Sequence, residues 1–270
     1  MIKRCVYSVI TNNYDELHEI KFKSNLRFIC FTDNKDLKVK GWETIFFQIK
    51  NSKNFNENRK IKMFPNKYLK NFDQTLYIDG NIRVKKDPEP LFDKYLKNNF
   101  LVISKHPFRD CLYEEAKFIK FSKKLNKEEI NALDNQIKSY YLKGMPKHFG
   151  LWENNIILRK NNHPQNVIVS KLWWEEYSKG VKRDQVSFPF IIWLRKINIG
   201  IFCETPRINN TFFEYELHNS AKSKSIFLQI KLLANIRQKQ SLFYKFLNLL
   251  FTQINELFNS LKKLFLKKEF

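Results

Sequence analysis

The sequence predicts an α/β protein in which helices cover both faces of a mostly parallel central sheet, followed by a basic helical tail. In residues 1–220, short apolar runs rich in β-branched and aromatic residues alternate with stretches of helical periodicity. That alternation is typical of strands joined by helical crossovers, and therefore of a parallel sheet. After residue 220 the chain contains neither Gly nor Pro, which favours uninterrupted helix. We therefore expect two units, an α/β domain at 1–220 and a helical tail at 221–270.

Each predicted element of the α/β domain is a run whose apolar spacing fits one of the two periods. Strands are predicted at residues 5–10, 26–31, 44–48, 75–78, 101–103 and 156–158. Helices are predicted at residues 58–69, 112–124, 127–142, 167–177 and 185–195. The first of these helices is predicted although it contains Pro65.

The tail combines an apolar stripe with a strong positive charge. Residues 221–270 contain ten Lys or Arg and two Glu, a net charge of +8. Apolar residues recur at steps of three and four, as on one face of a helix, at Phe243, Leu247, Leu250, Phe251, Ile254, Leu257, Leu261, Leu264 and Phe265. Lysines flank this stripe at Lys245, Lys262, Lys263, Lys267 and Lys268. The pattern predicts a basic amphipathic helix or helix pair that lies in an anionic membrane interface, or that packs on its own domain or a second subunit.

The composition indicates a folded protein of a reducing compartment. Of the 270 residues 43% are hydrophobic, which is enough to bury a large core. The four cysteines are isolated in the sequence, which argues against a zinc ribbon or a disulfide framework. The first strand begins at residue 5, which leaves no room for a signal peptide, and no apolar run reaches the length of a membrane span. We expect a cytoplasmic protein, held peripherally on the inner face of the membrane if the tail binds lipid.

The net charge of +22 limits the classes of partner. Nucleic acid is a common partner of basic proteins, but the sequence contains no helix-turn-helix, zinc-finger spacing or RNP-like aromatic motif. We therefore expect no nucleic-acid partner. Phosphate-bearing substrates or an anionic membrane surface explain the charge as well.

Oxygen-bearing side chains follow several predicted strands, where ligands bind in open α/β sheets. They are Asn12, Asp15, Asp33, Asp79 and Asn81. Mg²⁺ and Mn²⁺ prefer hard oxygen ligands and often bridge them to phosphate. A strand that ends in an Asp-Gly turn explains the last pair equally well.

Three further segments gather polar and charged residues beside predicted strands or at helix starts. They contribute His106, Arg109 and Glu115, then Trp152 and Glu153, and then Arg183, Asp184 and Gln185. Arginine suits bidentate binding of phosphate or carboxylate, a carboxylate can act as a base or bind a sugar hydroxyl, and an indole offers a stacking face. Helix-start acids, a core tryptophan and a solvated loop are the structural alternatives. His218, near the domain end, is either a third metal ligand or a surface residue.

Taken in order, these segments resemble one known family. The residues that carry the resemblance are Tyr14-Asp15, Cys30-Phe31-Thr32-Asp33, Lys67-Tyr68, Tyr77-Ile78-Asp79-Gly80-Asn81, His106-Pro107-x-Arg109-Asp110-Cys111-x-Tyr113-Glu114-Glu115-Ala116, Gly150-Leu151-x-Glu153, Arg159, Trp173-Trp174 and Arg183-Asp184-Gln185-x-Ser187-Phe188. Together they are similar to the glycosyltransferase-like family formerly called DUF616, the TOD1/MUCI70 type. The resemblance covers about residues 5–218 and leaves the tail outside.

The resemblance implies a GT-A-like fold that binds a nucleotide sugar with a divalent metal, Mn²⁺ or Mg²⁺. It implies a metal site at Asp79, Asn81 and His218, with Asn81 in place of the second Asp of a strict Asp-x-Asp. It implies that Asp184 presents an acid to the donor sugar or the acceptor. We expect Glu115 and Glu153 to act with it, as a base or by binding sugar hydroxyls. From the residues themselves we expect substrate contacts from Asn12, Asp15, Asp33, His106, Arg109, Trp152, Arg183 and Gln185.

We expect transfer of a sugar, from a UDP-sugar, to a cell-surface polysaccharide or lipid-linked glycan. Two alternatives stand beside it. One is a membrane-associated, metal-dependent lipid amidohydrolase of the ceramidase type, and the other is a basic nucleic-acid-binding protein.

Overall fold

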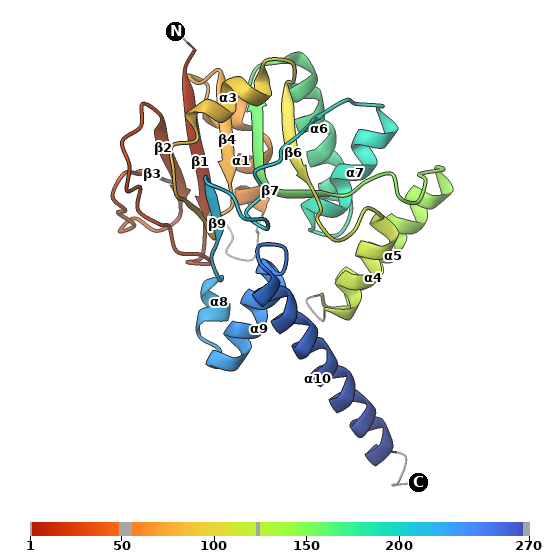
Figure 1. The fold of residues 1–270 in the computed structure, drawn as a ribbon. Helices are drawn as coiled ribbons and strands as arrows, with labels where there is room; N and C mark the ends of the chain where they lie inside the picture. The colour runs from red at the N-terminus through yellow and green to blue at the C-terminus, as the bar shows by residue number, and fades with distance from the viewer. Residues whose placement is uncertain (1, 49–55, 123–124, 267–270) are drawn as a thin grey trace.

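The computed structural model describes residues 2–48, 56–122 and 125–266, with side chains described up to Leu257. Seven strands form one sheet in the order β3-β2-β1-β4-β7-β6-β8 (Figure 1). They are β1 (Arg4–Ile10), β2 (Arg27–Thr32), β3 (Glu43–Phe46), β4 (Gln74–Ile78), β6 (Leu101–Lys105), β7 (Trp152–Lys160) and β8 (Gly200–Ile201). The first four run parallel, β8 is parallel to β6, and β7 is antiparallel to both of its neighbours. The predicted α/β class with a mostly parallel sheet is confirmed.

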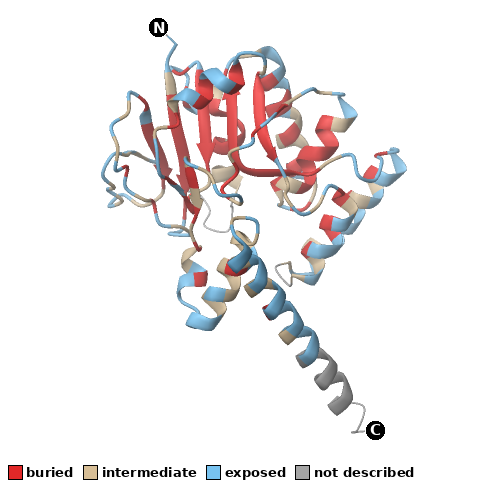
Figure 2. Cartoon of the chain, viewed as in Figure 1, coloured by how far each residue is buried: buried red, intermediate tan, exposed pale blue. Residues whose placement is uncertain are grey.

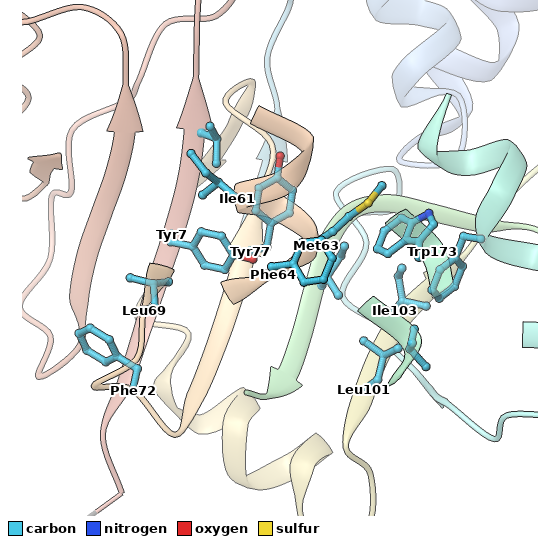
Figure 3. Packing of buried hydrophobic residues seen from close by; sticks show 14 of the residues in the cluster. Tyr7, Ile61, Met63, Phe64, Leu69, Phe72, Tyr77, Leu101, Ile103 and Trp173 are labelled. Carbon is cyan, nitrogen blue, oxygen red and sulfur yellow. The ribbon is translucent and has the colours of Figure 1, made fainter. Parts of the chain in front are cut away.

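Elements pack on both faces of the sheet because its strands send alternate apolar side chains to opposite sides. On one face, α1 (Asn56–Met63), α6 (Pro164–Lys179) and α7 (Asp184–Leu194) share a core with Tyr7 and Tyr77 (Figure 3). On the other face, α3 (Glu89–Leu96) and the small sheet of β5 (Ile82–Val84) and β9 (Phe213–Tyr215) pack on Val6 and Leu76. The neighbouring residues Leu76 and Tyr77 thus enter different cores.

Helix α7 joins two cores because apolar residues surround most of its circumference. Its Phe188 lies in the core that contains Tyr7 and Tyr77. Val186 and Phe190 belong to a third cluster, with α4 (Leu112–Phe121) and α5 (Lys127–Leu142). This double burial fixes the start of α7, and with it Asp184, relative to the sheet.

Two predicted elements differ from the observed ones. The helix predicted at 58–69 is divided into α1 and α2 (Pro65–Tyr68), because Phe64 leaves the helical conformation before Pro65. The strand predicted at 156–158 begins at Trp152, so Glu153 lies within β7 and not in a loop before it. The first half of β7 carries polar side chains, so it does not form the apolar run from which a strand is predicted.

The tail begins with α8 (Asn219–Lys222) and continues as α9 (Ile226–Arg237) and α10 (Leu242–Leu266), beyond the sheet edge at which β1 and β4 end (Figure 1). The rings of Phe227 and Phe251 lie 5.2 Å apart where α9 contacts α10. Most of α10 up to Leu257 is exposed (Figure 2). The side chains outside the described part include Leu261, Lys262, Lys263, Leu264, Phe265, Lys267 and Lys268. The described tail is a helix pair that follows one short helix.

Candidate active site

A pocket of about 150 Å³ lies at the carboxyl end of β4. Its lining residues are Arg59, Lys62, Asp79, Glu153, Asn154, Asn155, Asp184, Gln185, Arg207 and Tyr215. Four of them, Asp79, Glu153, Asp184 and Gln185, were predicted from the sequence. Two larger hollows, of about 610 and 630 Å³, contain no predicted site residue in their described linings.

Lys62 connects two of the three carboxylates of the pocket, Asp79 and Asp184. Its Nζ atom lies 2.8 Å from Asp184 Oδ2 and 3.3 Å from Asp79 Oδ1, and its side chain is only 2% exposed. The ammonium also lies 4.8 Å from the centre of the Tyr77 ring. A buried ammonium is stable only when it is paired, so Lys62 ties α1 to the end of β4 and to the start of α7.

Asp184 is ionised in this environment. Burial alone would raise the pKa of Asp184, but the charges of Lys62 and Arg59 lower that pKa well below its ordinary value. A carboxylate with a strongly lowered pKa is a weak base. Asp184 is therefore better suited to bind hydroxyl groups or to hold cations than to remove a proton.

Glu153 closes one wall of the pocket through a pair with an arginine. Its carboxylate accepts hydrogen bonds from Arg207 Nε and, at 2.9 Å, from Thr205 Oγ1. The Arg207 guanidinium lies 4.9 Å from the centre of the Tyr215 ring. β7, the segment before β9 and β9 itself thus build this wall together.

Two buried amides face the pocket with hydrogen-bonding capacity left over. Both side-chain polar atoms of Asn154, and Oδ1 of Asn155, have no hydrogen-bond partner. The two residues are only 6% and 5% exposed. A buried polar atom without a partner costs about 1–3 kcal/mol. Their position in the pocket lining indicates a polar ligand that supplies the missing hydrogen bonds.

A second group of predicted residues meets at the rim, between the loop after β1 and the end of β9. His218 Nδ1 lies 2.6 Å from Asp15 Oδ1, and His218 Nε2 lies 3.4 Å from Asn81 Nδ2. Burial and the carboxylates of Asp15 and Asp79 raise the pKa of Tyr14, whose ring lies 5.1 Å from that of His218. The structure therefore brings Asn81 and His218 together, although 137 positions separate them in the sequence.

The segment with His106, Arg109 and Glu115 lies outside the pocket lining. Glu115 is buried and accepts a hydrogen bond from Arg109 Nε, while His106 Nδ1 accepts one from Arg109 N at 3.0 Å. Burial, followed by the charges of Arg109, Arg207 and Lys239, lowers the pKa of His106 to about 3. In this structure the three predicted residues bind one another.

The remaining predicted contacts are distributed around the site. Asn12 N donates to both carboxylate oxygens of Asp33, each at 3.0 Å, which joins the turns after β1 and β2. Trp152 is buried in the core between Phe149 and Phe188, so its ring is not an open stacking face.

At the start of α7, Gln185 Nε2 donates to Trp152 O at 2.9 Å. Arg183 precedes the helix as its N-cap, and its charge contributes to the lowered pKa of Asp184.

Sequence reasoning missed Arg59, Lys62 and Arg207. Arg59 and Lys62 stand three positions apart on one helix, just before the strand that ends in Asp79. That spacing places both on the same face and was the available signal. Nothing in the local sequence around Arg207 distinguishes it from the other basic residues.

Comparison with known proteins identifies a family for most of the chain. Residues 3–218 match the family described as TOD1/MUCI70, glycosyltransferase-like domain. A protein of Arabidopsis thaliana named "Probable hexosyltransferase MUCI70" is 28% identical over 137 residues, which cover 47% of this chain and 22% of that protein. The chain therefore spans about a fifth of that relative.

Several solved structures are similar at low identity. The bifunctional glycosyltransferase WbbM is 15% identical with a TM-score of 0.47, and the match covers 88% of this chain and 45% of that one. The glycosyltransferase GlyE of Streptococcus pneumoniae TIGR4 is 13% identical with a TM-score of 0.44, covering 76% and 46%. Mouse xyloside xylosyltransferase 1 is 12% identical with a TM-score of 0.41, covering 73% and 83%.

The family match extends over most of the α/β domain and includes every residue of the pocket lining. The mixed sheet, with acids gathered at the end of β4, fits the GT-A-like fold that the sequence motifs imply. The chain belongs to the TOD1/MUCI70 family of glycosyltransferase-like domains.

Proposed function

We propose that this protein transfers a sugar from a nucleotide sugar, with a UDP-sugar as the expected donor, to a cell-surface polysaccharide or lipid-linked glycan. The observation that carries the proposal is the pocket itself. It places buried amide atoms without hydrogen-bond partners, both of Asn154 and the oxygen of Asn155, beside paired carboxylates and cations. A sugar ring offers several hydroxyl groups at the spacing that such a lining can bind.

The size of the pocket fits one sugar ring better than a whole nucleotide sugar. Sites for drug-sized ligands usually enclose about 300–1,000 Å³, whereas this pocket encloses about 150 Å³. The nucleotide would then extend across the carboxyl ends of β1 and β2. Asn12 and Asp33 lie there, already joined by hydrogen bonds.

The charges of the lining support a role for a divalent metal. The pocket contains three carboxylates and three cations, which balance. The diphosphate of a nucleotide sugar would add negative charge that the lining does not neutralise. A divalent cation would neutralise it and stabilise the departing diphosphate.

The residues expected to hold the metal offer suitable atoms. Asp79 supplies a carboxylate. His218 binds Asp15 through Nδ1, so its Nε2 atom is available for a metal, and Asn81 Nδ2 lies 3.4 Å from that Nε2 atom. Asn81 Nδ2 also donates to Glu216 O at 3.1 Å, so the amide oxygen is the atom that would bind the cation. One carboxylate, one amide oxygen and one imidazole form a set that Mn²⁺ accepts.

The proposed division of labour follows from the hydrogen bonds. Lys62 bridges Asp79 and Asp184, and Tyr77 donates to Asp79 at 2.6 Å. Asp184, Glu153 and the two amides would bind and orient the sugar hydroxyls. Orientation of this kind lowers the barrier because the reacting groups no longer have to find each other.

The test is a thermal-shift screen of UDP- and GDP-sugars with and without Mn²⁺. A donor at 100 times its Kd should stabilise the protein by about 2.7 kcal/mol. Asp184→Asn should lose this stabilisation. Asp134→Asn, at an exposed carboxylate on α5 paired with Lys120, is the matched control and should keep it. No stabilisation by any nucleotide sugar in the presence of Mn²⁺ would refute the proposed donor.

A membrane-bound acceptor is the second part of the proposal, and it rests on the tail. α9 and α10 expose large apolar side chains at Ile226, Phe227, Ile230, Leu242, Phe243, Phe246, Leu249, Leu250 and Leu257. Basic side chains are interspersed with them, so the described surface combines the two features that bind anionic lipid. No helix within the described residues is long and apolar enough to cross a membrane.

The tail is fastened to the rim of the pocket. Arg237 at the end of α9 donates to Tyr215 O at 3.0 Å and lies 3.2 Å from Glu214. Gln240 in the next turn donates to Pro206 O at 2.8 Å. A membrane that holds the tail would therefore lie near the pocket, where a lipid-linked acceptor could reach it.

Vesicle co-sedimentation tests this part separately. The protein should bind vesicles that contain phosphatidylserine and bind neutral phosphatidylcholine vesicles much less. Phe243→Ser combined with Phe246→Ser should reduce the binding. Phe121→Ser, at a residue 83% exposed on α4, is the control for loss of an exposed ring outside the tail. Equal loss in the control would refute a specific role for the tail.

A further inference from the structure

Cys111, Glu114 and His148 form a cluster of metal-binding side chains outside the pocket. One possible ligand atom from each lies within 4.8 Å of the other two. Cys111 is the N-cap of α4, Glu114 lies in its first turn, and His148 comes from the segment between α5 and β7. None of the three belongs to the pocket lining or to the metal site proposed above.

The imidazole of His148 is already held in place. Its Nδ1 atom lies 2.7 Å from Asp110 Oδ1, which leaves the lone pair of Nε2 for a cation. Metal-binding histidines usually donate their other ring nitrogen to a carboxylate in this way. His148 also has a φ of +56°, a conformation uncommon for residues other than glycine. Such backbone geometry persists where the surroundings impose it, often at functional positions.

The two segments that carry the cluster are joined independently of any metal. Gly150 N donates to Asp110 O at 2.9 Å, and Tyr113 Oη donates to Met145 O at 2.6 Å. The ligand atoms therefore need only a small adjustment to bind one ion. In a tetrahedral zinc site neighbouring ligand atoms lie roughly 3–4 Å apart, and the exposed side chains of Glu114 and His148 can close the difference.

We propose that Cys111, Glu114 and His148 bind Zn²⁺, with Asp110 as the residue that orients the imidazole. A thiolate, an imidazole and a carboxylate are all zinc ligands, and the thiolate disfavours Mg²⁺ and Ca²⁺. The Cys111 thiol releases its proton when it binds the ion. Three protein ligands leave one position for water. The ion would fasten the segment before β7 to the start of α4, and so support the strand that carries Glu153.

Metal analysis of the full-length protein tests the proposal. After exposure to Zn²⁺ and dialysis, the wild type should retain one zinc ion per chain. Cys111→Ser, Glu114→Gln and His148→Gln should each lose it. Cys203→Ser removes the exposed thiol and is the matched control that should keep it. Glu114 and His148 are exposed, so their variants are expected to fold even if the buried Cys111 variant does not.

Substitution by Co²⁺ gives a second readout that does not depend on activity. A thiolate-to-cobalt charge-transfer band should appear in the wild type and in Cys203→Ser, and it should be absent in Cys111→Ser and weak in His148→Gln. Asp110→Asn should bind zinc about 10–100-fold more weakly, since it removes the partner of a ligand. Zinc retention below one-tenth of an ion per chain, or equal loss in Cys203→Ser, would overturn the proposal.

Discussion

Asp184 and Glu115 are both buried carboxylates near helix starts, and each is paired with a cation. Asp184 shares Lys62 with Asp79 in a pocket whose amides still lack partners. Glu115 is satisfied by Arg109 and lies outside that lining. The difference teaches that an ion pair alone does not mark a site. What distinguishes the pocket of Asp184 from the surroundings of Glu115 is the presence of buried polar atoms without hydrogen-bond partners.

The largest expected effect tests how much the protein depends on the pair at Asp184. Lys62→Met leaves two carboxylates near each other without their shared cation and should lower the free energy of unfolding by about 3–5 kcal/mol. Urea unfolding measures this change. Lys60→Met on the same helix removes a partly exposed lysine that lies 3.9 Å from Glu57 and 5.3 Å from the centre of the Trp174 ring, and should change stability by about 1 kcal/mol or less. Similar values for both variants would show that the buried pair is not needed.

A smaller effect tests whether Glu115 is structural. Glu115→Gln should cost about 1–3 kcal/mol of unfolding free energy, because Arg109 loses its charged partner. The stabilisation by donor and Mn²⁺ should remain, in contrast to Asp184→Asn. The two readouts come from unfolding curves with and without donor. Loss of the donor effect in Glu115→Gln would place this carboxylate at the substrate, as the sequence motifs imply.

Asn154 should give opposite changes in stability and in binding. Asn154→Leu removes two buried polar atoms without partners, so the free protein should become as stable as the wild type or more stable by about 1 kcal/mol. The same variant should lose most of the donor-induced shift. A stability loss combined with normal donor binding would mean that the amide serves the fold and not the ligand.

The effect that is smallest at neutral pH concerns the titration of His106. Burial and the charges of Arg109, Arg207 and Lys239 keep the pKa of His106 at about 3 in the folded protein, below its ordinary value of about 6.5. Between these two pH values His106 is protonated in the unfolded chain and neutral in the folded protein. The free energy of unfolding therefore falls as pH falls from about 6.5 to about 3. His106→Gln should make the decline in unfolding free energy across this window shallower. An unchanged slope would mean that His106 titrates normally.

Six of the seven strands in the large sheet were predicted, because burial leaves a readable apolar pattern, whereas the short strands β5, β8 and β9 were not. Tyr77 and its neighbours form such a run, and β4 was found where the sequence indicates it. The first half of β7 was not found, because it carries Glu153 and Asn154. Both residues line the pocket, and their polar side chains interrupt the apolar pattern by which a strand is recognised in the sequence.

Within the site, acids were easier to predict than cations. Asp79 and Asp184 stand at a strand end and a helix start, where position alone suggests a role. Lys62 stands at no such position, and its spacing from Arg59 is a weak signal in a chain with 49 lysines and arginines. Its burial depends on partners that reach it only through tertiary structure. Glu115 was predicted as a site residue from its local motif. The motif does not reveal that Arg109 occupies its carboxylate in the folded protein.

The turn between α9 and α10 determines where the chain can be shortened. Its donors are Arg237, Lys239 and Gln240, and they bind the carbonyl oxygens of Tyr215, Pro107 and Pro206. A chain ended at the family boundary near residue 218 would expose those three carbonyls to solvent. A stop codon after Ser241 would keep all three and still remove the whole of α10. Crystallisation or labelling of the α/β domain without α10 should therefore begin from residues 1–241.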